Sequence, residues 1–214
     1  MVIKSLSANS GHPASISIRC LGCRQIGVFK NVTSNDFYTL DDVTKSHLIM
    51  GLKHCPNTEC GCFVYVVYGT VDSRLKVIAT FPPERIDFDS SNIPPAILNA
   101  FEEAITCHAN QCYIAAAIMI RKTLEELCND KNITGNNLRQ KITALGSSVI
   151  LPSDLLLGVD VLRLLGNDAA HVESQEFNKV GRDEIEIAIE FTKELLKSVY
   201  QYTNLLNRLN ALRK

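Results

Sequence analysis

Paired cysteines are the clearest chemical pattern in this chain of 214 residues. Two pairs, each with its own turn residues, lie about thirty residues apart. Two thiolates on one tight turn can face one metal ion, and a second turn brought back by a β-hairpin completes a tetrahedron. A glycine near each pair permits the tight backbone that such turns need. The sequence therefore predicts a zinc site with the ligands Cys20, Cys23, Cys55 and Cys60.

Other ligands and other roles for these cysteines stay open. Cys62 and His54 lie beside the second pair and compete with Cys60 for the fourth ligand position. A redox Cys-x2-Cys pair normally opens a helix in a βαβ unit, and no such pattern is visible. Simple burial as small apolar residues does not explain why five of the eight cysteines share one short region. Because four cysteines leave no open coordination position, we expect the zinc to be structural.

A second group of chemically capable side chains lies in the C-terminal part of the chain. Histidine has the ordinary pKa that suits proton transfer near neutral pH, and arginine offers a charged fork that matches phosphate. Together, Arg163 and His171 have the composition of a metal-free RNA cleavage site. In such a site His171 takes the proton of the 2′-hydroxyl and Arg163 stabilises the phosphate. The competing interpretation is a surface ion pair between Asp160 and Arg163, with His171 hydrogen-bonded to a loop.

Arg121 and Glu125 continue an apolar ridge along the helix expected over residues 112–129. A buried arginine must be paired, and Glu125 lies one turn further on. These residues and the group around Arg163 are therefore expected to form one polar cluster, in which Asn167 caps a broken helix end. The expected members are Arg121, Glu125, Arg163, Asn167 and His171.

Two differently patterned regions must position these groups. Short extended segments mark residues 1–80 as a small β module, because they alternate or are rich in β-branched and aromatic side chains. Two prolines and a Ser/Asn cluster then mark residues 81–92 as a linker. Helical periodicity holds over residues 93–214, so we predict an α+β chain that is mainly α. The expected strands are residues 15–19, 63–68 and 75–79.

Capping residues divide the helical region. Asn136 or Asn137 opens a short helix, and the helix that starts after Ser153 is expected to end at Gly166.

The last helix is expected to run from Asp183 to Leu212, with Glu186 as the partner of Asp183 in a capping box. This helix is longer than its neighbours, and its apolar stripe continues beyond their reach. We therefore expect the far end to pack against a second chain, which predicts a homodimer.

The composition excludes several classes of protein. Lys and Arg number 22 and Asp and Glu 23, so a broadly basic surface for nucleic acid is absent, although a local RNA site is still allowed. The longest apolar run, Cys112 to Ile120, is about half of the roughly 20 residues that a bilayer requires. No signal peptide pattern opens the chain. We therefore expect a cytoplasmic protein without a membrane partner.

Several of these motifs resemble the DUF4145 family, a helical domain that occurs alone and fused to restriction-type enzymes. The paired cysteine turns also look like those of many stand-alone members. The resemblance covers most of the chain, from about Ile18 to Tyr200. It rests on Ile93-Pro94, Arg121-Lys-Thr-Leu124-Glu125, Leu162-Arg163-Leu-Leu-Gly166-Asn167-Asp-Ala-Ala170-His171 and Val199-Tyr200.

The resemblance implies a bundle similar to the HEPN superfamily, which follows here a zinc-ribbon-like module. Many HEPN proteins are ribonucleases with an Arg-x4-6-His motif and a site completed across a dimer, and others serve only in binding. In this chain seven residues separate Arg163 from His171, and Leu164 follows the arginine in place of a polar residue. The sequence thus departs from the catalytic motif at two points.

Two functions follow. The first is a defence-associated nucleic-acid-processing protein, a metal-independent HEPN-like ribonuclease with a structural zinc. The alternative is a non-catalytic zinc-binding helical module for dimerisation and for recruitment of a protein partner. Convergence of Arg163 and His171 in one positive cleft favours the ribonuclease. An internal carboxylate that pairs with Arg163 favours the binding module.

Overall fold

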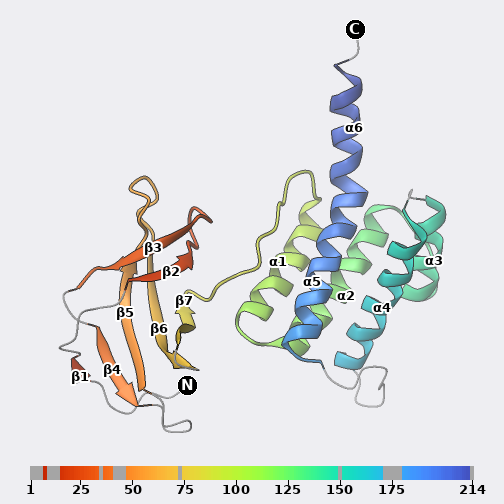
Figure 1. Cartoon of the computed structure of the whole chain (residues 1–214). Helices are drawn as coiled ribbons and strands as arrows, with labels where there is room; N and C mark the ends of the chain where they lie inside the picture. The colour runs from red at the N-terminus through yellow and green to blue at the C-terminus, as the bar shows by residue number, and fades with distance from the viewer. Residues whose placement is uncertain are drawn as a thin grey trace. The chain divides into compact units, whose positions relative to one another are not determined.

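The chain divides into two compact units, Met1–Glu84 and Arg85–Lys214. The first unit contains strands and the second contains helices (Figure 1). This arrangement confirms the predicted α+β class, a small β region followed by a helical region. The computed structural model describes residues 7–8, 15–33, 36–40, 47–71, 74–148, 151–170 and 180–212.

One curled sheet forms the described part of the first unit, and all its strand pairs are antiparallel. The central strand is β5, which pairs with β6 along one edge and with both β3 and β4 along the other. The sheet extends outward as β2 joins β3, β1 joins β4 and β7 joins β6. The strands are β1 (Ser7–Ala8), β2 (Ile16–Arg19), β3 (Ile26–Asn31), β4 (Phe37–Leu40), β5 (His47–His54), β6 (Phe63–Val71) and β7 (Arg74–Phe81).

Alternating apolar residues explain the strands that the sequence predicted. On β6, Val64, Val66 and Tyr68 are buried on one face and pack with Ile16 and Phe29. The expected strands at 15–19, 63–68 and 75–79 correspond to β2, β6 and β7. The sequence missed the other four strands, β1, β3, β4 and β5. In β3 most of the residues are exposed, and the segment has no clear apolar alternation.

The helical unit is built around α2, which contacts α1, α3, α4 and α5. Its buried side chains include Ile120, Leu124 and Leu127, and α5 adds Ile185 and Ile189 to the same core. No described helix combines the length and the apolar character needed to cross a bilayer. The helices are α1 (Pro95–Ala109), α2 (Tyr113–Asp130), α3 (Leu138–Ser148), α4 (Ser153–Ala170), α5 (Arg182–Leu196), the π-helical η1 (Lys197–Gln201) and α6 (Tyr202–Asn210).

The expected helix end at Gly166 is wrong, because α4 continues to Ala170. A Cβ atom at position 166 would lie 2.6 Å from the Cβ of Arg121. Gly166 therefore allows α2 and α4 to approach closely, and it does not end the helix. The same correction applies to Asn167, which lies inside α4 and caps no broken end.

The other helix boundaries follow the expected signals more closely. Asn137 opens α3, since its Oδ1 accepts a hydrogen bond of 3.0 Å from the backbone N–H of Gln140. The long last helix is present as α5, η1 and α6 in succession. Its start differs from the expected capping box: Glu184 accepts a 3.0 Å hydrogen bond from the backbone N–H of Gly181.

The second half of the predicted linker packs on the helical unit. The ring of Phe88 meets that of Phe101 edge to face, with 4.7 Å between centroids. The side chain of Gln201 donates a 2.8 Å hydrogen bond to the carbonyl of Asp89. Residues 85–92 are thus part of the helical unit, although the prolines before them and their own Ser/Asn cluster predicted a spacer.

Candidate functional site

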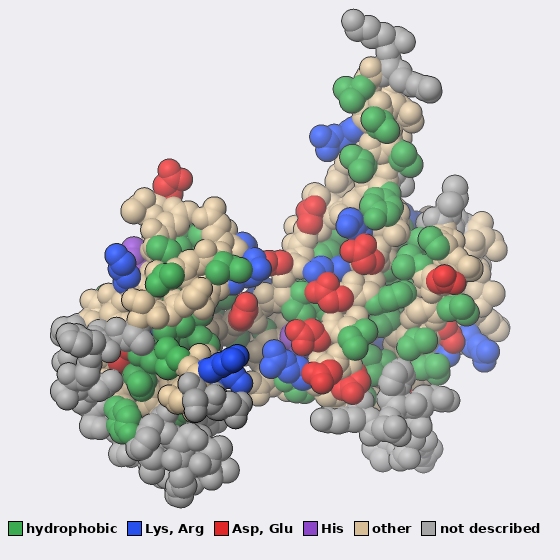
Figure 2. All heavy atoms as spheres, in the orientation of Figure 1, with side chains coloured by type: hydrophobic (Ala, Val, Ile, Leu, Met, Phe, Trp, Pro, Cys, Tyr) green, Lys and Arg blue, Asp and Glu red, His purple; other side chains and the backbone are tan. Residues whose placement is uncertain are grey.

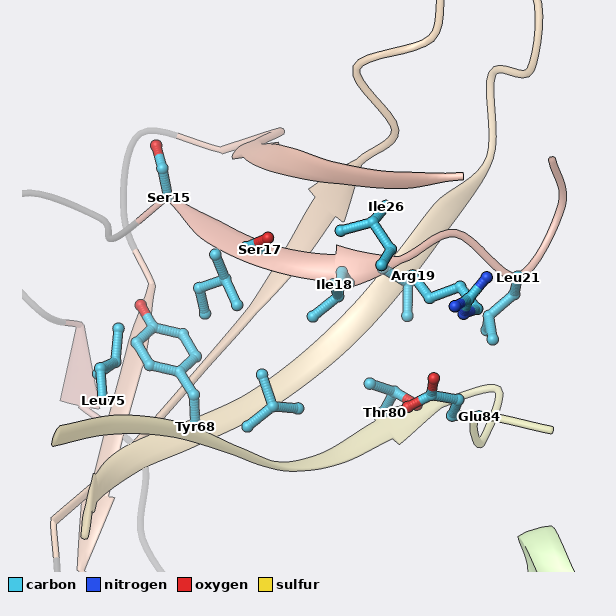
Figure 3. Close-up of a pocket in the computed structure, with 13 residues that line it drawn as sticks. Ser15, Ser17, Ile18, Arg19, Leu21, Ile26, Tyr68, Leu75, Thr80 and Glu84 are labelled. Carbon is cyan, nitrogen blue, oxygen red and sulfur yellow. The ribbon is translucent and has the colours of Figure 1, made fainter. Parts of the chain in front are cut away.

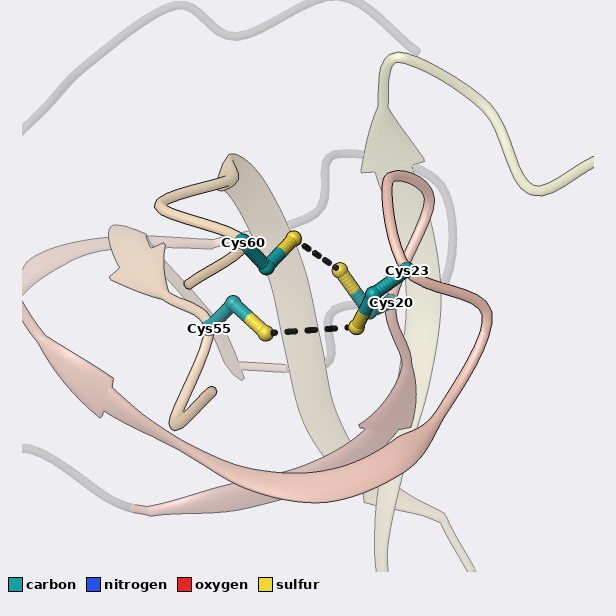
Figure 4. Close-up of side chains that lie close together, drawn as sticks. All are labelled: Cys20, Cys23, Cys55 and Cys60. Carbon is teal, nitrogen blue, oxygen red and sulfur yellow. Dashed lines mark hydrogen bonds between the residues drawn. The ribbon is translucent and has the colours of Figure 1, made fainter. Parts of the chain in front are cut away.

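Four cysteine side chains point toward one another at one end of the curled sheet (Figure 4). Cys20 and Cys23 lie in the turn between β2 and β3, and Cys55 and Cys60 lie in the turn between β5 and β6. The last residues of β3, Lys30 and Asn31, pair antiparallel with the last residues of β5, so the start of β3 extends beyond the end of β5 and lies beside the turn that follows it. This pairing brings the turn before β3 and the turn after β5 to the same end of the sheet.

The sulfur positions fit a tetrahedral metal ion. The Sγ of Cys20 lies 3.6 Å from that of Cys60, and the Sγ of Cys23 lies 3.8 Å from that of Cys55. All four sulfur atoms lie within 4.8 Å of one another. A zinc–thiolate bond of about 2.3 Å gives a tetrahedron with edges of about 3.8 Å. The four cysteines could therefore hold one metal ion between them.

Two glycines make this approach possible. Gly61 has a φ of 61°, a left-handed conformation that side chains with a Cβ rarely adopt. A Cβ atom at Gly22 would lie 3.0 Å from the Sγ of Cys60. The absence of a side chain at this position therefore lets the second turn approach the first. These are the turn residues that the sequence pattern indicated.

The backbone of the first turn favours the thiolate form of Cys20. Burial acts against ionisation, but hydrogen bonds from the backbone of Cys23 and Gly22 outweigh it together with those from the side chains of Cys55 and Cys60. They lower the pKa of Cys20 to about 6. In the second turn, burial raises the pKa of Cys55 to about 12. A bound cation would supply the charge that both thiolates need, since metal ligation requires the deprotonated form.

The two competing ligands lie beside the cluster, and Cys62 interacts with Cys20, but each has a further partner outside it. The Sγ of Cys62 donates to the carbonyl of Phe63 at 3.6 Å, and the ring of His54 packs against the ring of Phe63 with 4.8 Å between centroids. Neither belongs to the set of mutually close ligand atoms, in which Cys60 is the fourth member.

The predicted polar cluster assembles in part, around Arg121 on the face shared by α2 and α4. The guanidinium of Arg121 donates hydrogen bonds to the side-chain oxygen of Asn167 and, at 3.5 Å, to the backbone carbonyl of Arg163. Its Nε lies 3.3 Å from a carboxylate oxygen of Glu125. The Arg121 side chain thus connects α2 to α4 and brings Glu125 and Asn167 into one group.

The side chain of Arg163 has a different partner. Its Nε donates a 2.6 Å hydrogen bond to Asp160 one turn earlier, and this bond lowers the pKa of the Asp160 carboxyl group. This is the i, i+3 pair that competes with the catalytic interpretation. His171, the remaining predicted member of the cluster, lies outside the described residues.

A buried charged group in the β unit was not indicated by the sequence. Lys53 lies 2.7 Å from the carboxylate of Asp36, and both side chains are fully buried. Tyr68 and Asn31 also donate hydrogen bonds to Asp36, the latter at 2.8 Å. The sequence offered one signal for this pair: Lys53 directly follows the uncharged residues 48–52. A lysine that continues such a strand needs a buried acidic partner.

Comparison with known proteins adds one family. The family described as domain of unknown function (DUF4145) matches residues 102–213, which is more than half of the chain. The match includes both arginines of the α2–α4 face and excludes the four clustered cysteines. No curated protein and no solved structure matches the chain.

Proposed function

Because the chain belongs to the DUF4145 family, we propose that it is a non-catalytic binding module with a HEPN-like helical bundle and a zinc-stabilised β unit. The observation that carries this proposal is the pairing of both arginines with carboxylates. Glu125 pairs with Arg121, and Asp160 pairs with Arg163. An arginine that stabilises a phosphate in a transition state uses its fork for that phosphate. Here the Nε of each guanidinium already has an acidic partner, which supports a structural role.

The β unit is proposed to hold one Zn²⁺ through its four cysteine thiolates. A tetrahedral set of four sulfur ligands favours zinc or iron, and a closed set of four protein ligands favours a structural role. Elemental analysis of the purified full chain tests the metal, and one zinc per chain is expected. A chain that carries iron in place of zinc, or no metal after purification with zinc in the buffers, contradicts this assignment.

The binding partner proposed for the helical unit is a second copy of the chain. Along α6 the side chains of Leu205, Leu206 and Leu209 are 58%, 59% and 61% exposed, as the apolar patches on α6 in Figure 2 show. A contiguous apolar surface of this kind marks an interaction site. The expected dimer would bury these leucines against their equivalents.

Sedimentation of a truncated chain tests the dimer. A chain that ends at Tyr202 is expected to be a monomer at micromolar concentration, whereas the full chain is a dimer. Leu157→Glu serves as a control, because Leu157 is 69% exposed on α4, away from the removed segment. A full chain that sediments as a monomer contradicts the proposal.

Ribonuclease activity stays as the second candidate, and the position of Asn167 supports it. Asn167 accepts a hydrogen bond from Arg121, and it precedes His171 by four residues in the sequence. The Arg121 and Glu125 side chains are 27% and 37% exposed, so solvent reaches the group. A prokaryotic defence role and a cytoplasmic location belong to the same proposal.

Cleavage of a fluorescent single-stranded RNA in the presence of EDTA decides between the two functions. The binding-module proposal predicts no cleavage by the full chain. Cleavage that His171→Ala reduces at least a hundredfold, with an unchanged melting temperature, would establish the ribonuclease instead. His12→Ala is the matched control, because it removes a histidine from the other unit of the chain.

A further inference from the structure

A cavity of about 590 Å³ opens in the β unit between β2 and β7 (Figure 3). Val64 and Tyr68 of β6 form its floor, and Leu75 and Val77 of β7 line one side. The other side is the segment 15–19, which includes all of β2. Its volume lies within the range of about 300 to 1,000 Å³ that is typical of ligand sites.

The cavity lies between two strand edges. Along the path β2-β3-β5-β6-β7, the described part of the chain pairs β2 only with β3 and β7 only with β6. Successive residues of β2, which point to opposite faces of the sheet, all border the cavity. The edge of β2, and not one face alone, therefore lines it. Among the described residues no further strand pairs with the edges of β2 at Ile16–Ile18 and of β7 at Leu75 and Val77, and such an edge presents backbone N–H and C=O groups to the cavity.

We propose that the cavity binds an extended peptide from a partner protein, which adds a strand between β2 and β7. A strand is the ligand that can hydrogen-bond to two facing backbone edges at once. The four residues of β2 set the length of the added segment. At about 3.3 Å per residue, this segment extends over about 13 Å.

The lining also sets the side chains of the peptide. Alternate residues of a strand point to the same face, so every second side chain would enter the cavity and contact Ile18, Tyr68 and Val77. Arg19 and Glu84 both line the cavity and lie toward the same end of it (Figure 3). The peptide is therefore expected to be apolar at alternate positions, with a polar residue beside this pair of opposite charges.

The same lining argues against a purely apolar ligand such as an acyl chain. Such a ligand would cover the strand edges and the side chains of Ser15 and Thr80 without hydrogen bonds. A buried polar group without a partner costs about 1 to 3 kcal/mol. A peptide backbone supplies a donor and an acceptor at each residue and avoids that cost.

Selection from a phage-displayed library of random heptapeptides on the full metal-loaded chain tests the proposal. The expected result is enrichment of peptides with apolar residues at alternate positions. The most enriched peptide, synthesised with a fluorescent label, should bind the chain with Val77→Glu at least tenfold more weakly. Ile78→Glu is the matched control: the two side chains are neighbours on β7, 38% and 45% exposed, and only Val77 lines the cavity.

A second probe separates strand addition from side-chain binding. The same peptide with N-methyl groups on alternate backbone nitrogens loses donors to the strand edges and should bind at least tenfold more weakly. Circular dichroism and zinc content verify that each variant folds, and Leu75→Lys replaces Val77→Glu if the latter does not. Equal binding by the N-methylated peptide overturns the proposal. Two further results would also overturn it. One is a selection in which no peptide is enriched on the native chain relative to the Val77→Glu variant. The other is a fluorescent fatty acid that binds the chain while no peptide does.

Discussion

The ion pair of Lys53 with Asp36 in the β unit and that of Arg121 with Glu125 in the helical unit differ in their access to water. Lys53 and Asp36 in the β unit are fully buried, with 0% of each side chain exposed. Arg121 and Glu125 in the helical unit are 27% and 37% exposed. Burial decides the role of each pair. If one partner of the buried pair is removed, the remaining charge has neither a partner nor water around it. If one partner of the half-exposed pair is removed, water still solvates the remaining charge.

The buried pair is completed by neutral groups. Tyr68 and Asn31 donate to Asp36, and Asn31 also accepts from Lys53, so each charged atom of the pair has hydrogen-bond partners. A buried charge persists only with such partners. The half-exposed pair needs no such shell, and its Arg121 uses the remaining donors to join α2 to α4. The first pair is therefore important for folding, and the second can change at low cost.

The largest expected effect separates the two units. Cys20→Ser combined with Cys55→Ser should abolish metal binding and unfold the β unit, because a structural zinc site contributes about 10 to 16 kcal/mol to folding. The helical unit has its own core and should stay folded. Hydrogen exchange read by mass spectrometry should show complete exchange up to Glu84 and protection in α2.

Cys112→Ser provides the control for the cysteine variant, since Cys112 is an exposed cysteine of the helical unit. It should leave both metal content and exchange unchanged. Full zinc content in the double variant would show that other residues bind the metal.

The next effect compares a buried with an exposed lysine of the same sheet. Lys53→Met should lower the free energy of unfolding of the β unit by about 3 to 5 kcal/mol, because it leaves Asp36 charged and buried without its cation. Lys30→Met, on the exposed side of β3, should change it by less than about 0.5 kcal/mol. Urea unfolding followed by circular dichroism measures both. Addition of Asp36→Asn to Lys53→Met should restore part of the loss, and equal effects of the two lysine variants would contradict a structural role for the buried pair.

A buried polar group without a partner should make the helical unit sensitive to acid. Neither ring nitrogen of His108 has a hydrogen-bond partner among the described residues. Burial lowers its pKa from the usual 6.5, helped by Arg182 and opposed by Glu186. Below pH 6.5 the unfolded chain therefore binds a proton that the folded chain does not, and stability falls as the pH falls.

A comparison with His108→Leu isolates this contribution. Between pH 7 and pH 5 the native chain should lose stability more steeply than the variant, by at most about 1.4 kcal/mol per pH unit. Thermal unfolding at a series of pH values measures the difference. Parallel curves for the two chains would show that His108 titrates equally in the folded and unfolded states.

The smallest effect is expected at the half-exposed pair. Glu125→Ala should lower the free energy of unfolding by no more than about 1 kcal/mol, since water screens the charge of Arg121 and Asn167 still accepts its hydrogen bond. Glu190→Ala is the matched control, because Glu190 forms an i, i+3 pair with Lys193 on the surface of α5. If Glu125→Ala lowers the free energy of unfolding by several kcal/mol and Glu190→Ala does not, the Arg121–Glu125 pair is as important for folding as the buried pair.

Much of the fold could be predicted from local sequence. The period of apolar residues indicated the helices, and the β-branched run at β6 indicated a strand. The expected end at Gly166 failed, because a glycine that ends a helix and a glycine that admits a neighbouring helix look the same in sequence. Strand β3 was missed for a related reason: its Ile26 and Val28 are 68% and 54% exposed, so the usual alternation is lost.

The sequence by itself determined which side chains are available for chemistry: the spacing of the cysteine pairs, the adjacent glycines and the arginines within apolar helices. Tertiary structure alone decided which of them meet. The turn between β5 and β6 brings Cys60 to the cluster and directs Cys62 to a backbone carbonyl. Asp36 and Lys53 are seventeen positions apart, and β2 and β7 border one cavity although more than fifty residues separate them. Local preferences act over a few residues, whereas such contacts depend on the pairing and curvature of the whole sheet.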